Sequence, residues 1–269
     1  MRPSRFVLST VLAAVTAVVA LTAAGPARAN ERHFAFTHET ATLPRGAVEL
    51  EPWFTFRTGG EGFYNRYDSR LELELGVAEN LQTAFYLNLS ADAVEDGGEV
   101  VTQVFDPGVS WEWKWKLSDP VADAIGSGLY FELSAYPAEL EIELKLLLDK
   151  RVGDLLLAFN LVGAVEIEHE VGESETEGEV ELDLGIGWAL AEDLTLGVEL
   201  RQTSVVTEGE VEAAALFGGV TLSWQLERAW LVLSVLPQLA GLAGGADGDS
   251  LNLTEFERVE TRLILGVHL

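Results

Sequence analysis

The stretch GVSWEWKWKLSDP, residues 108–120, poses the main question about the fold of this chain. In an extended strand successive side chains point to opposite faces, so its three tryptophans share one face and Glu112, Lys114 and Lys116 share the other. A soluble sheet would turn the tryptophans inward against a second layer. A membrane barrel would turn them outward into lipid and leave the charged side chains in its lumen. The stretch alone is compatible with both, so the remainder of the chain has to decide.

The first 29 residues have the features of a secretory signal peptide. Two arginines precede an uncharged run from Phe6 to Ala24, and Ala27-Arg28-Ala29 supplies a small-residue cleavage pattern. We therefore expect residues 1–29 to be removed on export. A membrane anchor is the alternative, since the run is about long enough to span a bilayer. Beyond residue 29 charged or amide residues interrupt every apolar run, so membrane insertion would have to use strands.

The net charge and the cysteine content exclude some classes of partner and of metal site. The chain carries 44 acidic and 17 basic residues, a formal net charge of -27, and no cysteine. Such an acid excess repels nucleic acid, so we expect no nucleic-acid partner. Without cysteine there is neither a disulfide framework nor a thiolate metal site. We expect no cofactor and no dedicated metal site, and an exported, cysteine-free chain fits a periplasmic or outer-membrane destination.

Period-two alternation of apolar and polar residues runs through almost the whole remaining chain, without a helical stripe. It predicts strands of about 9 to 13 residues, which is the length that a tilted strand needs to cross a bilayer. The twelve predicted strands cover residues 46–57, 65–77, 81–91, 106–117, 127–136, 138–149, 155–168, 178–190, 194–204, 212–226, 229–240 and 256–269.

The predicted connections alternate in length. If the first strand runs outward, the connections on one side are short, except for residues 118–127. Those on the other side include four longer segments rich in Gly, Asp, Glu and Ser, at 92–105, 169–177, 205–211 and 241–255. Short turns on one side and long polar loops on the other are typical of outer-membrane barrels. An even number of strands also brings both ends of the barrel to the periplasmic side.

Three tryptophans support the same interpretation. Trp115, Trp188 and Trp224 each lie three or four residues before a predicted short turn. They would share one membrane interface, where an indole keeps its ring in the apolar zone and its N–H near water. The sequence therefore predicts one antiparallel, up-and-down transmembrane β-barrel over residues 46–269, all-β, with the tryptophan row facing lipid. A soluble periplasmic or secreted β protein is the alternative.

Two segments resemble Gram-negative outer-membrane β-barrels, particularly the transporter-like barrels of the "MetA-pathway of phenol degradation" type. They are TLPRGAVELEPWFTFRTG, Thr42–Gly59, where a Leu-Pro-basic-Gly entry leads into the first strand, and the closing strand TRLILGVHL, Thr261–Leu269. Such barrels usually finish on an aromatic residue, whereas this sequence finishes on Leu269. The resemblance implies an outer-membrane barrel that transports a solute, without naming the solute.

Parity assigns the charged residues of the strands to the lumen, because a charge facing lipid would cost about 2 to 4 kcal/mol near mid-bilayer. Two interpretations of this lumen stay open: acids and bases pair and fill it, or an unpaired acid excess lines a narrow water path that favours cations. The predicted lumen-lining residues are Glu49, Glu51, Arg57, Arg70, Glu72, Glu74, Glu112, Lys114, Lys116, Glu132, Glu141, Glu143, Lys145, Glu166, Glu181, Asp183, Glu199, Arg201, Glu260 and Arg262.

Residues 30–45 alternate only weakly before Pro44. They are predicted to hang in the periplasm or to fold into the lumen as a plug, and Phe34 and Phe36 favour partial docking because mobile aromatic rings would be costly to leave in water. The Gly185-x-Gly187 pattern falls in mid-strand, where small residues make room for a neighbour. It is not a phosphate-binding loop.

No catalytic constellation is recognisable. None of the four histidines is predicted to lie on the outer wall beside an outward serine, as a membrane phospholipase would need. We therefore expect that the protein is not an enzyme. We expect a channel or transporter-like barrel for small solutes, with a preference for cations. The alternative is a non-conducting structural or adhesion barrel. The expected location is the outer membrane of a Gram-negative bacterium, after export through the periplasm. The expected partners are outer-membrane lipids, lipopolysaccharide, an unidentified small molecule or ion, and the barrel-insertion machinery.

Overall fold

A computed structural model describes residues 32–269 except 61, 97–98, 105–106, 171–172 and 247. The predicted signal peptide lies outside the described residues. Strands and their connections make up the described part, which contains no α-helix. No helix in these residues has the length and hydropathy that a membrane span requires.

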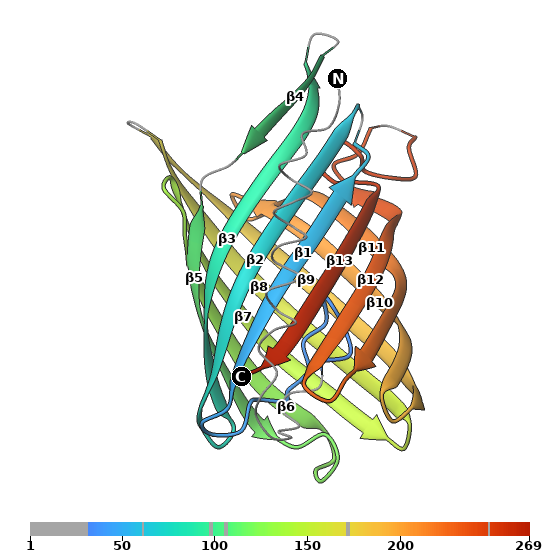
Figure 1. The fold of residues 1–269 in the computed structure, drawn as a ribbon. Coiled ribbons are helices and arrows are strands. Elements are labelled where there is room, and N and C mark those ends of the chain that lie inside the picture. Colours follow the sequence, from blue (N-terminus) through green and yellow to red (C-terminus); the bar gives the residue numbers. More distant parts are fainter. Residues whose placement is uncertain (1–31, 61, 97–98, 105–106, 171–172, 247) are drawn as a thin grey trace.

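The strands form one closed antiparallel barrel (Figure 1). Twelve of them form the wall, in which each pairs with the next wall strand along the chain, including β3 with β5, and β1 pairs with both β2 and β13, which closes the ring. The predicted fold class, an up-and-down barrel of twelve strands, is confirmed. The bounds are β1 Val48–Thr58, β2 Tyr64–Ala78, β3 Leu81–Asp96, β4 Glu99–Val104, β5 Gly108–Ser118, β6 Gly126–Ala135, β7 Glu139–Val152, β8 Leu155–Glu170, β9 Glu173–Ala191, β10 Leu194–Thr207, β11 Glu210–Gln225, β12 Ala229–Ala243 and β13 Val259–His268.

Several predicted loops are strand. The segment 92–105 contains the end of β3 and the whole of β4. Strand β4 pairs only with residues 91–96 of β3, the end that lies away from the short turns. The segment 205–211 is a tight hairpin whose turn is formed by Glu208 and Gly209 with φ of 54° and 87°. Two successive positive φ angles characterise the two-residue turn that suits the twist of paired strands. The acidic composition misled the prediction, because a strand that extends beyond the barrel wall is solvated on both faces.

Exposure alternates along the strands as the predicted barrel requires. In β5, Trp111 and Trp115 are 41% and 54% exposed, whereas Glu112 and Lys114 are 2% and 5% exposed. The tryptophan row thus lies on the outer surface and the charges lie inside, which answers the question that the stretch 108–120 raised.

The predicted interface tryptophans lie at one level of the outer wall. Trp115 pairs with Leu81, Trp188 with Leu155 and Trp224 with Leu194, and each partner is the first residue of the strand after a short turn. All three indoles are exposed, by 54%, 54% and 43%. Their proposed place at a membrane interface stays a prediction.

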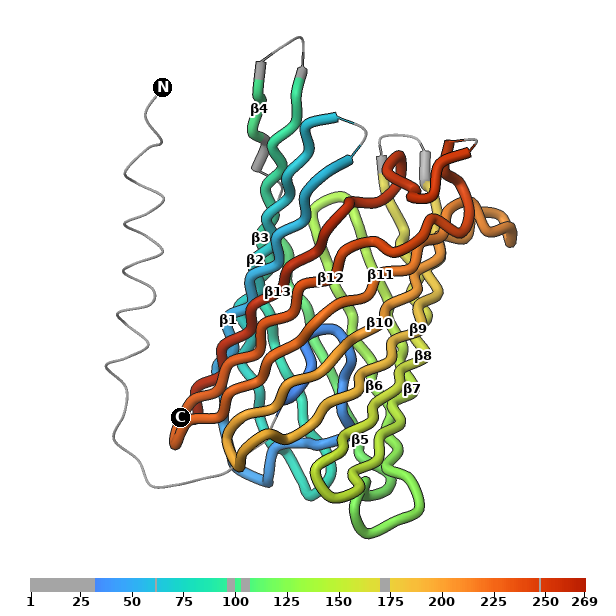
Figure 2. Tube along the Cα trace, turned by 90° about the vertical axis from the view of Figure 1, so that its right-hand side faces the viewer, coloured from blue at the N-terminus to red at the C-terminus, as the bar shows by residue number. Residues whose placement is uncertain are grey.

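The interior contains more than charge. A cluster of buried apolar side chains lies inside the barrel, where parity predicted charged residues. They pack on the segment before β1, which Figure 2 shows in blue within the barrel. Burying apolar surface against this segment offsets the absence of lipid contact. The cluster comprises Ala35, Phe36, Trp53, Ala215, Phe217, Trp230, Val232, Leu236 and Ile264.

Candidate functional site

Residues 32–43, the inserted segment, lie inside the barrel, and hydrogen bonds tie the backbone N–H groups of residues 35–37 to one wall. The carboxylate of Glu199 on β10 accepts the backbone N–H groups of Ala35, Phe36 and Thr37 at 3.0, 2.8 and 2.9 Å. These donors have no strand or helix partner of their own, and an unpaired buried N–H is costly. A buried carboxylate that accepts three N–H groups is in turn well satisfied.

Other strands hold the same segment from other sides. Asn160 on β8 accepts the backbone N–H of His38 at 2.6 Å and donates to its carbonyl oxygen at 2.8 Å. On β7, Asp149 accepts from the Thr40 N–H at 2.9 Å and hydroxyl at 2.8 Å. The side chain of Gln82 on β3 accepts the N–H of Leu43 at 2.9 Å. Anchors on four separate strands mean that the segment crosses the lumen from wall to wall.

An aromatic ring locks this segment against β9. The ring of Phe34 is fully buried and lies so close to Gly185 that an added Cβ there would meet three ring atoms at 2.9 Å. At Gly187 an added Cβ would lie 3.2 Å from the same ring. The interpretation of the Gly-x-Gly pattern as room for a neighbour is confirmed, and the neighbour is Phe34.

His38 marks the boundary between the segment and the space above it. Its ring packs edge-on against Tyr130 at 5.2 Å between centroids. Burial, reinforced by the charges of Lys145 and Arg32, lowers the pKa of His38 well below its usual value. The imidazole is therefore neutral at neutral pH and adds no positive charge to the interior.

Above the segment lies a cavity of about 690 Å³. Phe36 and His38 contribute to its floor, and the outer connection 136–138 contributes to its rim. Between them the wall carries nine acidic and six basic side chains. The cavity therefore belongs to the outer half of the lumen, on the side away from the short turns.

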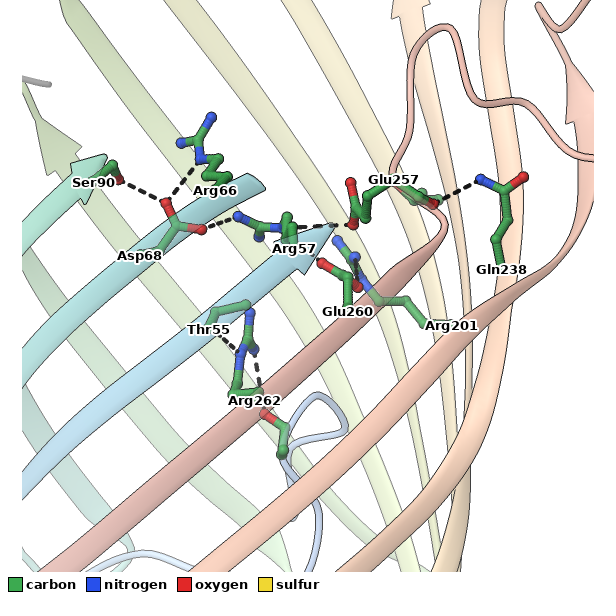
Figure 3. Close-up of polar contacts among 12 residues, drawn as sticks. Thr55, Arg57, Arg66, Asp68, Ser90, Arg201, Gln238, Glu257, Glu260 and Arg262 are labelled. Carbon is green, nitrogen blue, oxygen red and sulfur yellow. Dashed lines mark hydrogen bonds and ion pairs between the residues drawn. The ribbon is translucent and has the colours of Figure 1, made fainter. Parts of the chain in front are cut away.

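Five of the six bases of the cavity take part in ion pairs, and Figure 3 shows Arg57, Arg66 and Arg201 among them. Arg57 on β1 pairs with Asp68 and, through Nε, with Glu260 Oε1 at 2.8 Å. Arg201 reaches Glu260 Oε2 at 2.8 Å and Glu181 Oε2 at 2.5 Å. Glu260 thus bridges two guanidinium groups that come from different sides of the lumen. This supports the pairing interpretation for this part of the interior.

The guanidinium groups of Arg70 on β2 and Arg262 on β13 are also held in place, partly by aromatic rings. Arg70 pairs with Glu132 and lies 4.1 Å from the ring of Tyr86. Arg262 donates to Thr55 at 2.9 Å and lies 4.1 Å from the ring of Phe36, so it joins the barrel wall to the inserted segment. Charge pairing and cation–π contacts fix these long side chains.

The acids of β7 and β8 differ. Glu141 and Glu166 line the cavity, are partly exposed to it, and have no ion-pair partner among the described residues. Together with Glu139 each offers a carboxylate oxygen within 4.8 Å of the others. Unpaired carboxylates that face water make the local potential negative. This supports the second interpretation for the opposite wall.

The predicted lumen-lining residues lie at two heights inside the barrel, around the cavity and around or below the inserted segment. Ten members line the cavity: Arg57, Arg70, Glu132, Glu141, Glu143, Lys145, Glu166, Glu181, Arg201 and Arg262. The others do not line it, and most are buried around or below the inserted segment: Glu49, Glu51, Glu72, Glu74, Glu112, Lys114, Lys116, Asp183, Glu199 and Glu260. Lys116 is half-buried and pairs with Asp119 at 2.6 Å at the short-turn end.

Five charged residues of the cavity were not among the predicted lumen-lining residues. Arg66, Asp68, Glu139, Glu168 and Glu179 share the parity of predicted neighbours on the same strands, so the alternation contained the signal that would have found them. Alternation gave no such signal for the inserted segment, for which Phe34 and Phe36 favoured partial docking without choosing between the lumen and the periplasm. Its position depends on contacts with strands more than a hundred residues away.

Solved structures share this architecture at low sequence identity. The COG4313 outer membrane channel from Pseudomonas putida F1 is 14% identical, with a TM-score of 0.61 over 88% of this chain and 100% of that one. The NanC porin is 11% identical, with a TM-score of 0.53 over 82% of this chain and 100% of that one. The β domain of the Bordetella autotransporter BrkA is 13% identical, with a TM-score of 0.52 over 84% and 100%.

These likenesses establish the fold of an outer-membrane β-barrel, and the predicted general resemblance to such barrels is confirmed. No curated protein matches the sequence. A family model matches residues 26–269, which include every strand of the barrel. The chain belongs to the family of unknown function DUF6662.

Proposed function

We propose that this protein is a channel for small solutes, with a preference for cations, in the outer membrane of a Gram-negative bacterium. The observation that carries the proposal is the 690 Å³ cavity in the lumen, in which Glu141 and Glu166 face the open space without an ion-pair partner among the described residues. Unpaired carboxylates lower the energy of a cation and raise that of an anion.

The outer wall supports a membrane location. Its exposed side chains are apolar along the length of the strands, for example Leu87 on β3, Leu144 on β7 and Val220 on β11, at 62%, 58% and 57% exposure. Water would solvate such a surface poorly, whereas lipid matches it. Export through the periplasm, insertion by the barrel-insertion machinery and contact with outer-membrane lipids and lipopolysaccharide follow from this location. The predicted resemblance to "MetA-pathway of phenol degradation" barrels implies solute transport and so also favours a channel.

The inserted segment has a direct bearing on transport. We infer that residues 32–43 act as a plug that limits passage between the cavity and the short-turn end of the barrel. Its anchors are hydrogen bonds to individual side chains such as Glu199 and Asn160 rather than a strand ladder. Breaking these contacts leaves the strand ladder of the wall intact, so the plug can open without unfolding the wall.

Planar-bilayer recordings test the proposal. We expect the purified barrel to conduct, and its reversal potential in a salt gradient to report cation preference. In the double variant Glu141→Gln/Glu166→Gln that preference should weaken. The matched control is Glu192→Gln, which removes a carboxylate from an exposed short turn. Anion preference in the unmodified protein, or an unchanged reversal potential in the double variant, would contradict the proposal.

The inserted segment also favours a second candidate, a non-conducting barrel with a structural or adhesion role. A variant that lacks residues 32–43 separates the two. The channel proposal expects a folded barrel with increased conductance and faster swelling of liposomes in small solutes. A folded variant that remains impermeable would support the structural barrel instead.

A further inference from the structure

Four glutamates form a buried group on the inner face of β1 and β2. Glu49 pairs with Glu74 and Glu51 pairs with Glu72 across the two strands. All four side chains face inward, and their exposed fractions are 0%, 3%, 0% and 0% in that order. Like charges directly opposite one another destabilise a sheet, and a buried charge without compensation is costlier still. Something must neutralise this group.

The hydrogen bonds of the group leave one set of oxygens unused. One oxygen of Glu49, Glu51 and Glu74 accepts an N–H, from Trp230, Trp53 at 3.2 Å and Gln82 at 3.0 Å respectively. The second oxygen of Glu51 and of Glu74 has no hydrogen-bond partner among the described residues, and neither has either oxygen of Glu72. Donors thus orient the carboxylates of Glu51 and Glu74 while their other oxygens stay available.

Neighbouring bases do not balance the charge. Arg32 Nη1 lies 3.9 Å from Glu51 Oε2, but its Nε donates to the carbonyl oxygen of Phe34 at 3.1 Å. His268 Nδ1 lies 2.6 Å from Glu49 Oε2, at the edge of the group. Glu112, which accepts the Tyr86 hydroxyl, adds a further buried carboxylate nearby. The acids therefore outnumber the bases around Glu72.

We propose that Glu51, Glu72 and Glu74 bind a hard divalent cation of the calcium or magnesium class. Each offers a carboxylate oxygen within 4.8 Å of the others. Oxygen-only ligands with several negative charges are what these cations take. The N–H donors of Trp53 and Gln82 orient two of the ligands from the outside, as partners around metal sites do. The cation neutralises the buried group and joins β1 to β2 beneath the inserted segment.

The second acidic cluster of the lumen provides an internal comparison. Glu139, Glu141 and Glu166 are as close together, but they are half-buried and face the open cavity. Water can solvate these three, so they do not need a bound ion. Glu141→Gln is therefore the matched control: it removes a carboxylate from a triad of the same size on the same inner surface.

The experiment measures ion binding directly. Purified full-length barrel, treated with a chelator and then dialysed, is titrated with calcium and with terbium, whose luminescence is sensitised by a nearby indole such as that of Trp53. We expect one tightly bound ion per barrel. In Glu72→Gln the affinity should fall by at least about tenfold, while Glu141→Gln keeps it. Calcium should also raise the unfolding temperature of the unmodified protein and of Glu141→Gln, but not that of Glu72→Gln.

Two outcomes would overturn the proposal. In the first, the unmodified barrel binds no calcium, magnesium or terbium, and its infrared spectrum shows the absorption of protonated carboxyl groups, so that protons neutralise the group. In the second, the ion binds equally well to Glu72→Gln. The measurement on the unmodified protein decides even if a variant does not fold. Binding does not depend on conductance, so the proposed channel function and this site fail independently.

Discussion

Phe34 lies against Gly185, and no side chain larger than a hydrogen atom fits between the ring and β9 without displacing the ring. This contact joins the inserted segment to the barrel wall at a point far from it in sequence. It also offers a way to move the segment without touching a charged residue.

Gly185→Val should therefore release the segment. The added side chain would force the Phe34 ring away, while a β-branched residue suits the strand itself. We expect faster cleavage of residues 32–45 by protease in the folded barrel, and larger single-channel conductance. The control is Gly163→Val on β8, where an added Cβ meets nothing within 4 Å. Equal cleavage and conductance in the two variants would rule out this coupling.

Glu199→Gln should loosen the segment at a second point. The neutral amide cannot accept the three N–H groups of Ala35 to Thr37 with charge assistance, and such bonds contribute about 1.5 to 3 kcal/mol each. Hydrogen exchange at these three amides should accelerate by at least about tenfold, since each 1.4 kcal/mol corresponds to that factor. Exchange in the strands should not change. Unaltered protection of the three amides would show that Glu199 does not hold the segment.

Fluorescence quenching tests the orientation of the tryptophans. Brominated lipids should quench single-tryptophan variants that retain Trp115, Trp188 or Trp224, because these indoles are exposed on the outer wall. Variants that retain Trp53 or Trp230, exposed by 3% and 1%, should be protected. If lipid quenched both sets equally, or neither set, the barrel would not sit in the bilayer as proposed.

A charge on the outer wall should destabilise the protein in lipid. Leu144 on β7 is 58% exposed and lies far from both ends of its strand. Leu144→Arg is expected to cost about 2 to 4 kcal/mol in unfolding from bilayers. In a soluble protein an exposed leucine would tolerate the change almost without cost. Urea unfolding in liposomes measures the difference, and a cost near zero would favour the soluble alternative.

The stability of the connection between β12 and β13, which contains Glu257, should depend on pH. Burial and the nearby Glu260 carboxylate raise the pKa of Glu257 to about 7, from an ordinary value of 4.5. The folded connection therefore holds a proton that the unfolded chain releases, so its stability is greatest below pH 4.5 and falls as pH rises through about 7.

Glu257→Gln should remove this dependence and stabilise the connection above pH 7. Exchange of the Asn252 amide, which donates to Gln238 at 2.7 Å, reports opening of the connection after correction for the intrinsic rate. Glu255→Gln changes an exposed acid in the same connection and serves as the control. Persistence of the pH dependence in Glu257→Gln would assign it to another group.

Much of the barrel could be predicted because a barrel strand has a strict pattern. An apolar outer face and a polar lumen require alternation, so the outward position of Trp115 and the inward position of Glu112 follow from sequence parity alone. Strand ends were predicted less well, since the hairpin at Glu208-Gly209 continues past the wall, where both faces meet water and alternation no longer carries information.

The sequence by itself determined the all-β class and the number of strands in the wall, and it predicted an inner face for the charged residues of the strands, because these depend on local alternation. Only the tertiary structure decided that residues 32–43 enter the lumen, that Phe34 meets Gly185, and that Glu51, Glu72 and Glu74 converge while Arg57 and Arg201 share Glu260. These relationships depend on the closure of β1 onto β13 and on strand register, which bring together residues that no local pattern connects.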